Sequence, residues 1–303
     1  MKQAEQKMGI IYITFAYIFW GILPIYWKLV DNVQPGTILA HRIIWSFLFM
    51  IAIILVLKKW SPFIAECKAI FKNKKKLIGI SSASFIISLN WLTYIWAVNT
   101  EHVIQASLGY YMNPLVSILL GMIILKERLT RQQLASFLIA AIGVIYLAVS
   151  YGVFPWISLA LAITFGLYGL LKKTVDIGAM FGLAMETMIV TPLALIYVAA
   201  VPAHIFTINN MSTSTPLLLI GAGVATAIPL LLFASGAKQI PLSMVGFLQY
   251  IAPTIMLLLG VFLYHETFTH AHMVSFAFIW IALIIYMTSV QHRPAKKRKK
   301  ATS

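Results

Sequence analysis

The chain has 303 residues, of which 61% are hydrophobic and only 10% are charged, and its formal net charge is +15. Soluble domains carry about 25% charged residues, so this composition excludes a soluble globular protein and indicates one that crosses a membrane several times. The only cysteine, Cys67, excludes an intrachain disulfide.

Ten apolar stretches approach the ~20 residues that a helix needs to cross the hydrocarbon core. They cover residues 9–30, 36–57, 77–98, 103–125, 132–149, 154–171, 178–200, 216–236, 241–264 and 271–290. We therefore predict an all-α polytopic membrane protein with ten transmembrane helices. The first stretch is expected to remain as a span, because no small-residue cleavage pattern follows it. Residues 58–76 form a lysine-rich loop in this prediction.

Positive charge is distributed unevenly between the two sides of the membrane that these spans predict. With the N-terminus in the cytoplasm, 21 of the 23 Lys and Arg residues fall in cytoplasmic segments, the bias that sets orientation. The two exceptions are Lys28, on the outer side, and Arg42, inside the second span. Both termini are therefore expected in the cytoplasm. The basic tail is expected to contact anionic lipid rather than nucleic acid.

One stretch of the chain occurs twice, because residues 110–146 match residues 249–285 at a constant offset of 139. Each copy comprises five predicted spans. Because five is odd, two consecutive copies must enter the bilayer from opposite sides, as in many secondary transporters. We predict one unit over residues 1–149, an inverted unit over 150–290 and a tail over 291–303. The identical pairs are Tyr111/Tyr250, Pro114/Pro253, Gly121/Gly260, Glu127/Glu266, Thr130/Thr269, Ser136/Ser275 and Phe137/Phe276.

The duplicated block resembles the EamA repeat of the drug/metabolite transporter superfamily, and three further segments resemble its RarD branch. The resemblance covers essentially the whole chain. It implies ten helices, a bacterial plasma (inner) membrane location and export or exchange of small metabolites or drugs. The residues that carry it are Tyr111, Pro114, Gly121 and Lys126-Glu127-Arg128-Leu129-Thr130 for the repeat, and His41-Arg42-Ile43-Ile44-Trp45-Ser46, Asn90-Trp91 and Ile228-Pro229-Leu230 for the branch.

Two charged residues, Arg42 and Glu186, fall well inside predicted spans, where a charge costs about 2.5–3.5 kcal/mol. The internal alignment places them at matching positions of the second and seventh spans. Arg42 either binds an anionic substrate group or pairs with Glu186 in an empty cavity. The structural alternatives are a permanent ion pair and snorkelling of Arg42 to the interface. Glu186 is also a candidate proton carrier, provided that this pair is absent or broken during transport.

The third span carries Asn90, Trp91 and Tyr94, an aromatic and amide cluster. Aromatic walls with a few polar groups suit an amphipathic or cationic small molecule. Interhelical hydrogen bonds and interfacial tryptophan are an equally good explanation. Trp45, from the RarD-like segment beside Arg42, completes this group of substrate-binding candidates.

Two further sets of candidates come from the repeat and from prolines within spans. Proline frees a backbone carbonyl and bends a helix, which favours cavity linings and gates, although a structural kink explains it equally well. The predicted lining residues are Tyr111, Asn113, Gln249 and Tyr250, and the predicted helix-break or gating residues are Pro24, Pro114, Pro229 and Pro253.

Glu127 falls at a helix end rather than in mid-membrane, which indicates a structural role. Thr130 and Gln133 have the spacing of a capping box that opens the fifth span. His265, His270 and His272 gather in one outer turn but lack the cysteine or second carboxylate that a convincing metal site needs. No metal and no cofactor are predicted.

Together these patterns predict a secondary active transporter, a permease or exporter that moves a small organic metabolite or drug by alternating access. A membrane-embedded lipid-processing enzyme and a passive channel or scaffold are the alternatives, and saturable counterflow would separate a carrier from both. The expected partners are a small-molecule substrate, the lipid bilayer and a coupling ion such as a proton, with a homo-oligomer left open and nucleic acid excluded.

Overall fold

The computed structural model describes residues 2–30, 33–99, 102–152, 154–200, 215–265 and 269–291, all in helices, turns or short links. Ten segments of this part of the chain are long and apolar enough to cross a membrane, as predicted. Glu266 and most of the basic tail lie outside the described residues. The helices are α1 (Lys2–Lys28), α2 (Pro35–Val56), α3 (Trp60–Lys72), α4 (Lys74–Asn99), α5 (Val103–Ile123), α6 (Arg131–Ser150), α7 (Trp156–Thr174), α8 (Ala179–Ala200), α9 (Thr215–Ala237), α10 (Leu242–Gln249), α11 (Ile251–Phe262) and α12 (His270–Gln291).

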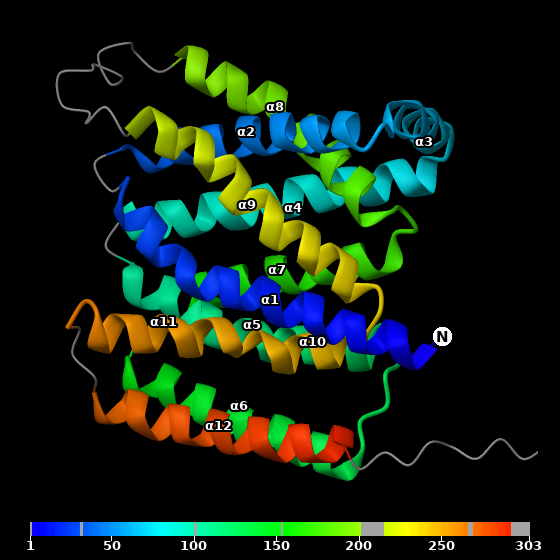
Figure 1. The fold of residues 1–303 in the computed structure, drawn as a ribbon. Coiled ribbons are helices and arrows are strands. Elements are labelled where there is room, and N and C mark those ends of the chain that lie inside the picture. Colours follow the sequence, from blue (N-terminus) through cyan, green and yellow to red (C-terminus); the bar gives the residue numbers. More distant parts are fainter. Residues whose placement is uncertain are drawn as a thin grey trace, which may run out of the picture.

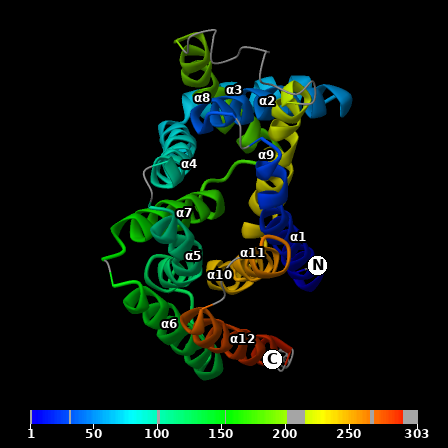
Figure 2. The same ribbon diagram turned by 90° about the vertical axis from the view of Figure 1, so that its left-hand side faces the viewer.

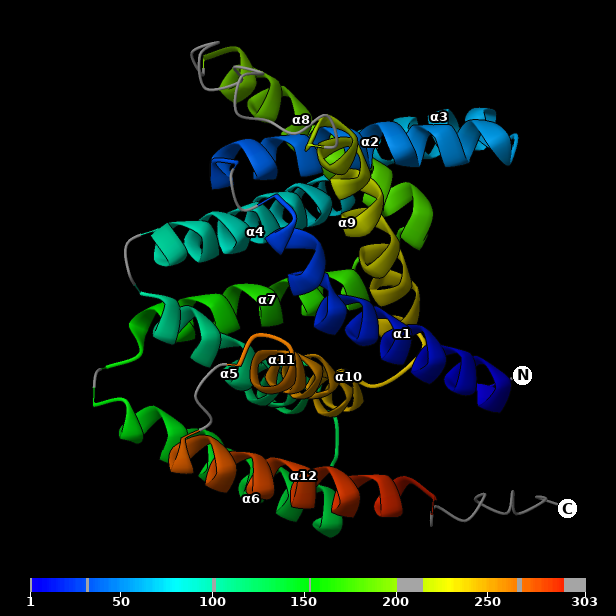
Figure 3. The same ribbon diagram turned by 60° about the vertical axis from the view of Figure 1, so that its left-hand side comes forward.

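The long helices run side by side, with α2 and α8 at one edge of the bundle and α6 and α12 at the other (Figures 1 and 3). Viewed roughly along the long helices, α4, α7 and α5 form one wall and α9, α1 and α10–α11 form the facing wall (Figure 2). The N-terminal end of α1, α3 and the C-terminal end of α12 lie at the same end of the bundle (Figure 1). We call this the N-terminal side of the bundle.

The packing between helices recurs in matched pairs. The contact of α5 with α7 matches the contact of α1 with α10 and α11. Likewise, the contact of α1 with α9 matches that of α7 with α4. Helices α2 and α8 pack on each other, as do α6 and α12. Lys126 and His265, which correspond in the internal match, both have a φ of 54 just after a helix end. This pattern is the one expected of two five-helix units related by a two-fold axis, and their division at residues 149 and 150 stays a prediction.

Residues 58–76, predicted as a loop, contain the additional helix α3. Phe63, Cys67 and Ile70 are buried at spacings of four and three, so α3 is amphipathic and packs its apolar face on the bundle. The loop prediction was wrong because the many lysines in this segment obscured that helical pattern.

The ninth span is divided between α10 and α11 at Tyr250, three residues before Pro253. Proline has no N–H, so the Gln249 carbonyl cannot receive its usual helical hydrogen bond. In contrast, helices α1, α5 and α9 continue through Pro24, Pro114 and Pro229. Of the four prolines predicted to break helices, only Pro253 is associated with a division of its span.

The outer face of α6 shows how the bundle meets lipid. Leu134, Leu138, Ile142 and Ile145 recur at helical spacing and are all exposed. Such a stripe would be unfavourable in water but matches the acyl chains of a bilayer. These residues therefore form part of the lipid-facing surface.

Candidate functional site

A cavity of about 600 Å³ lies between the two walls of the bundle. This volume falls within the range of about 300–1,000 Å³ typical of small-molecule sites. Helices of both predicted units contribute to it. Its wall comprises Tyr17, Trp20, Leu23, Pro24, Trp27, Lys28, Pro35, Ile38, Arg42, Ile87, Asn90, Trp91, Tyr94, Ala106, Gly109, Tyr110, Asn113, Leu161, Phe165, Thr226, Leu230, Gln249, Ala252, Pro253 and Met256.

The cavity occupies the half of the bundle opposite the N-terminal side. Its wall includes Lys28, the last residue of α1, and Pro35, the first residue of α2. Along α1 the wall extends inward to Tyr17, eleven residues from Lys28, which corresponds to ~16 Å of helix. The cavity therefore extends from the helix ends to about the middle of a ~30 Å hydrocarbon core.

Arg42 lies in this wall and is fixed by three contacts. Its Nε donates a hydrogen bond to Thr226 Oγ1 at 3.0 Å. Its guanidinium carbon lies 4.7 Å from the ring centroid of Trp27 and 4.8 Å from that of Trp91, which are cation–π distances. Arg42 is thus held beside the cavity by its neighbours instead of snorkelling to the interface.

Three amides add polar groups to a wall that is otherwise largely aromatic and aliphatic. Asn90 Nδ2 donates to the Leu161 carbonyl at 2.9 Å and to Thr164 Oγ1 at 2.8 Å, so it also ties α4 to α7. Gln249 Oε1 accepts a hydrogen bond from Ser117 at 3.2 Å. The Oδ1 atom of Asn113 is buried without a hydrogen-bond partner. Asn113 lines the cavity, but this oxygen has almost no accessible surface.

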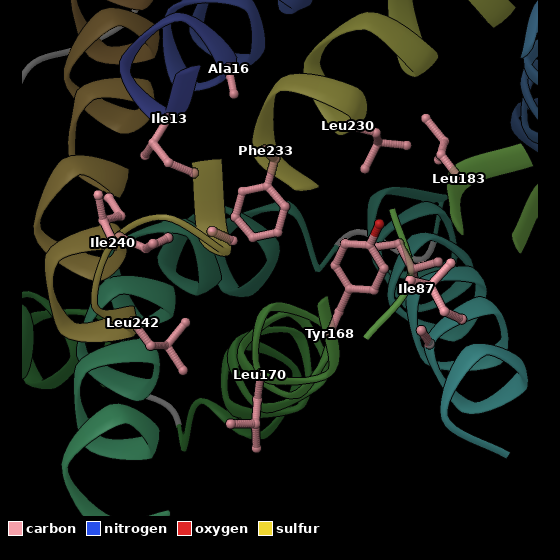
Figure 4. Packing of buried hydrophobic residues seen from close by; sticks show 14 of the residues in the cluster. Ile13, Ala16, Ile87, Tyr168, Leu170, Leu183, Leu230, Phe233, Ile240 and Leu242 are labelled. Atoms are coloured by element: carbon pink, nitrogen blue, oxygen red, sulfur yellow. The ribbon is translucent and has the colours of Figure 1, made fainter. Parts of the chain in front are cut away.

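Toward the N-terminal side, the cavity ends on a cluster of five aromatic residues that we call the aromatic floor: Tyr17, Trp20, Phe165, Tyr168 and Phe233. Phe233 stacks on Tyr168 at 6.0 Å between centroids and lies 5.7 Å from Phe165 and 5.6 Å from Trp20. Figure 4 shows Phe233 and Tyr168 facing each other between α9 and α7. Tyr17, Tyr168 and Phe233 are at most 1% exposed, so these rings close this end of the cavity.

Glu186 lies beyond the aromatic floor and does not pair with Arg42. Its Oε1 accepts a hydrogen bond from Lys172 Nζ at 2.8 Å and its Oε2 accepts one from Tyr168 at 3.2 Å. Both members of this ion pair are almost fully buried. They line a separate cavity of only about 10 Å³ that shares no residue with the larger one. The predicted pairing of Arg42 with Glu186 is therefore absent, because Lys172 from the end of α7 takes that place.

Glu127 joins the α5–α6 link to the start of α10. Its carboxylate accepts hydrogen bonds from the Leu242 N–H at 2.7 Å, the Ser243 N–H at 2.8 Å and the Ser243 hydroxyl at 2.7 Å. A carboxylate at a helix N-terminus is stabilised by the unpaired N–H groups and by the helix dipole. A Cβ at Gly121 would lie 2.8 Å from Glu127 Oε2, so this position leaves room for the carboxylate.

Thr130 and Gln133 form the predicted capping box of α6. Glu127 therefore lies in a helix-end network, as predicted.

Two lysines add further links at the N-terminal side. Lys173 donates to the carbonyls of Ala237 and Ile240, and Lys238 donates to those of Val175 and Ile177. These hydrogen bonds join the end of α7 to the end of α9. The pKa of Lys238 is lowered from its ordinary value, mainly because burial disfavours the charged form.

The structure brings some of the predicted site residues together and separates others. Eight of them line the cavity: Arg42, Asn90, Trp91, Tyr94, Asn113, Gln249, Pro24 and Pro253. Six do not: Glu186, Trp45, Tyr111, Tyr250, Pro114 and Pro229.

The residues outside the cavity wall have other surroundings. Trp45 donates to His41 Nδ1 at 3.2 Å. Tyr111 contacts the Phe276 ring at 5.3 Å, and Tyr250 is buried in the same apolar cluster. A lining role for these three residues, predicted from the sequence, therefore does not match where their side chains lie.

Apart from Pro24, sequence reasoning missed the contribution of α1. Tyr17, Trp20, Pro24 and Trp27 all line the cavity, and their spacings of three, four and three put them on one helix face. This aromatic stripe was a usable signal. Thr226, in contrast, gave none, because a threonine in an apolar span commonly bonds to its own backbone, as it also does here.

Comparisons with known proteins agree with this architecture. The profile of the EamA-like transporter family matches residues 7–149. The chain is 48% identical over 289 residues to YojE of Bacillus subtilis, an uncharacterized transporter, with 95% of this chain and 96% of that protein covered. It is 41% identical over 288 residues to the protein RarD of Escherichia coli, with 95% and 96% covered.

A solved structure described as "Crystal structure of protein" superposes with a TM-score of 0.71 at 17% identity and covers 93% of this chain and 98% of that one, which supports the fold alone. The identities to YojE and RarD extend over nearly the full length of the chain, and ten of its helical segments can span a membrane. The chain therefore belongs to the EamA-type family of drug/metabolite transporters, in its RarD branch, and is a multi-pass transporter of the bacterial plasma (inner) membrane.

Proposed function

We propose that the chain is a secondary carrier that moves a small organic molecule by alternating access, with the cavity beside Arg42 as its substrate site. The observation that carries this proposal is a site-sized cavity that extends from the helix ends to the aromatic floor in mid-bundle. Carriers with inverted repeats bind substrate near the midplane, between their two units. The contribution of both predicted units to the cavity wall supports the same view.

The closed side of the carrier is the N-terminal side in this proposal. The aromatic floor, the Glu127 contacts with α10 and the links made by Lys173 and Lys238 all lie between the cavity and that side. With the termini in the cytoplasm, this arrangement is the outward-facing state. Transport then requires the floor and the Glu127 contacts to separate while the opposite end closes.

The aromatic floor also favours a carrier over a passive channel. A conducting pore needs a continuous path, whereas the rings of Tyr17, Tyr168 and Phe233 fill the bundle axis with almost no exposed surface. A lipid-processing enzyme remains the second class, and its activity would appear as chemical change of a lipid rather than as movement of an unchanged solute.

Proton coupling through Glu186 is the finer part of the proposal. A protonated Glu186 would lose its ion pair with Lys172, which now joins α8 to α7. Proton uptake would thus loosen the N-terminal side just beneath the aromatic floor. Transport driven by a pH gradient should be lost in Glu186→Gln, and its persistence would exclude this coupling site.

Uptake into proteoliposomes tests the carrier itself. A metabolite and drug panel should include compounds whose flux saturates and is accelerated by unlabelled compound on the other side. Flux that rises linearly without counterflow would identify a channel, and consumption of lipid would identify an enzyme.

Cysteine labelling tests the direction of the cavity in a background that carries Cys67→Ser. An impermeant thiol reagent added outside should label Met256→Cys, in the cavity wall, and not Ala237→Cys, which is fully buried on the N-terminal side. The reverse pattern would contradict the outward-facing assignment.

A further inference from the structure

The two basic residues that fall outside the predicted cytoplasmic segments are also the two basic residues that line the cavity. Lys28 and Arg42 are the exceptions among the 23 Lys and Arg residues, and both belong to the cavity wall. No aspartate or glutamate belongs to that wall among the residues that the structure describes. The wall is therefore positive at its mouth and in its depth.

Arg42 has hydrogen-bond donors to spare on the side of the cavity. A guanidinium has five N–H donors in a planar fork, and the contact with Thr226 uses only the one on Nε. In the part of the chain that is described, no carboxylate lies within ion-pair distance of Arg42. Trp27 and Trp91 fix the fork in place, which favours bidentate binding of a carboxylate over binding of a point charge.

Arg42 is partly buried in the cavity wall and has no counter-ion among the described residues, so a substrate can supply the missing charge. Removing an ionised group from water costs several kcal/mol even after the protein relaxes, unless the group is paired. Lys28 rests over the Tyr264 ring at 4.4 Å near the end of α1, where it would attract anions toward Arg42.

The other residues of the cavity wall indicate the chemistry of the uncharged part of the substrate. Trp27, Trp91, Tyr94, Tyr110 and Phe165 present aromatic surface around the cavity.

We infer that the cargo is an organic anion, a carboxylate on an aromatic or apolar body, and that Arg42 binds the carboxylate. This inference rests on the proposed carrier function and names the class of its substrate. Of the amphipathic or cationic molecule that the third span suggested, it keeps the amphipathic character and rejects the positive charge, because the cation–π surface at Trp27 and Trp91 is already occupied by Arg42.

Matched series of probes test the assignment with protein purified into nanodiscs. The series are benzoate, benzamide and benzylamine; phenylacetate, phenylacetamide and phenethylamine; and cinnamate, cinnamamide and cinnamylamine. Within a series the aromatic body is kept, and the head group changes from an anionic carboxylate to a neutral amide and a cationic amine. Calorimetric titration should show the carboxylate binding more tightly than its amide and its amine in at least one series.

Variants then locate the binding group. Arg42→Gln should weaken carboxylate binding by about 10- to 100-fold, the value of a hydrogen-bonded charge. Arg42→Lys should recover only part of that loss, because it keeps the charge but not the fork. Lys68→Gln removes the same charge from an exposed position on α3 and should leave binding unchanged.

The outcomes separate the substrate class from the carrier function. If no carboxylate binds more tightly than its amide and amine, or if Arg42→Gln and Arg42→Lys both retain the preference, the anion assignment is wrong. Saturable counterflow of an amide or amine would then still support the carrier. If carboxylates bind at Arg42 but never cross the membrane, the proposed carrier function is wrong, and the assignment of a carboxylate ligand still holds.

Discussion

Glu127→Ala should open the N-terminal side of the bundle. The change removes three hydrogen bonds of 2.7–2.8 Å and leaves the N–H groups of Leu242 and Ser243 without their acceptor. A buried donor left unpaired costs about 1–3 kcal/mol, and helix caps contribute about 0.5–2 kcal/mol. Because Glu127 is only half-buried and water recovers part of the loss, we expect a net cost of about 2 kcal/mol.

This cost destabilises only the state in which α10 contacts Glu127 and the N-terminal side is closed. It therefore shifts the equilibrium toward the state in which that side is open. A shift of about 2 kcal/mol corresponds to about 30-fold in population. In inverted membrane vesicles, a cysteine at Ala237 should therefore react faster with an impermeant thiol reagent when Glu127 is alanine. Ala237 is fully buried at the end of α9, which makes it sensitive to this opening.

Thr130→Ala provides the matched control for Glu127→Ala. Thr130 caps α6 through Gln133 and is not among the residues that hold α10, so its loss should lower thermal stability without increasing labelling at Ala237. Equal effects of the two substitutions on stability and labelling would refute the idea that Glu127 holds the N-terminal side closed.

Three further predictions follow from individual contacts. Lys172→Met should lower the free energy of unfolding by about 3–5 kcal/mol, because it strands the buried Glu186 carboxylate, and a double change of both residues to methionine should restore most of it in thermal melts. Gly223→Ala should cost about 1–3 kcal/mol, since the added Cβ would lie 2.3 Å from the backbone of α2, whereas Gly178→Ala, with nothing within 4 Å, should be neutral in the same measurement. Tyr250→Phe should keep wild-type uptake in proteoliposomes, because its buried hydroxyl has no hydrogen-bond partner and lies outside the cavity; a clear loss would restore Tyr250 to the site.

The internal match predicted symmetry better than it predicted the cavity. Tyr111 and Tyr250 are identical in the match, and both pack in one apolar cluster with residues of α6 and α12. Successive residues of a helix are rotated by about 100°, so Tyr110 and Asn113 face the cavity while Tyr111 faces away. The position that matches Tyr110 is Gln249, and the one that matches Asn113 is Ala252. This identical tyrosine pair therefore serves packing, and the cavity wall differs between the two units.

The partner of Glu186 could not be predicted from spacing. The sequence suggested two charges inside the spans, and Lys172 was assigned to a cytoplasmic link at the end of the sixth. In the structure α7 extends to Thr174, and Lys172 is buried against Glu186 of α8. A shift of one turn at a span boundary was enough to hide this ion pair.

The sequence by itself determined the membrane class, the ten spans and the family, and it identified Arg42 as a charge within a span. These are local properties, because the length of an apolar run and a charge within it are visible in consecutive residues. Only the tertiary structure decided that Arg42 lies between Trp27 and Trp91, that Glu186 pairs with Lys172, and that an aromatic floor divides them. The physical reason is that bilayer thickness and position along the chain fix how deep a residue lies in the membrane. Which side chains it contacts depends on how neighbouring helices pack, and consecutive residues do not show this.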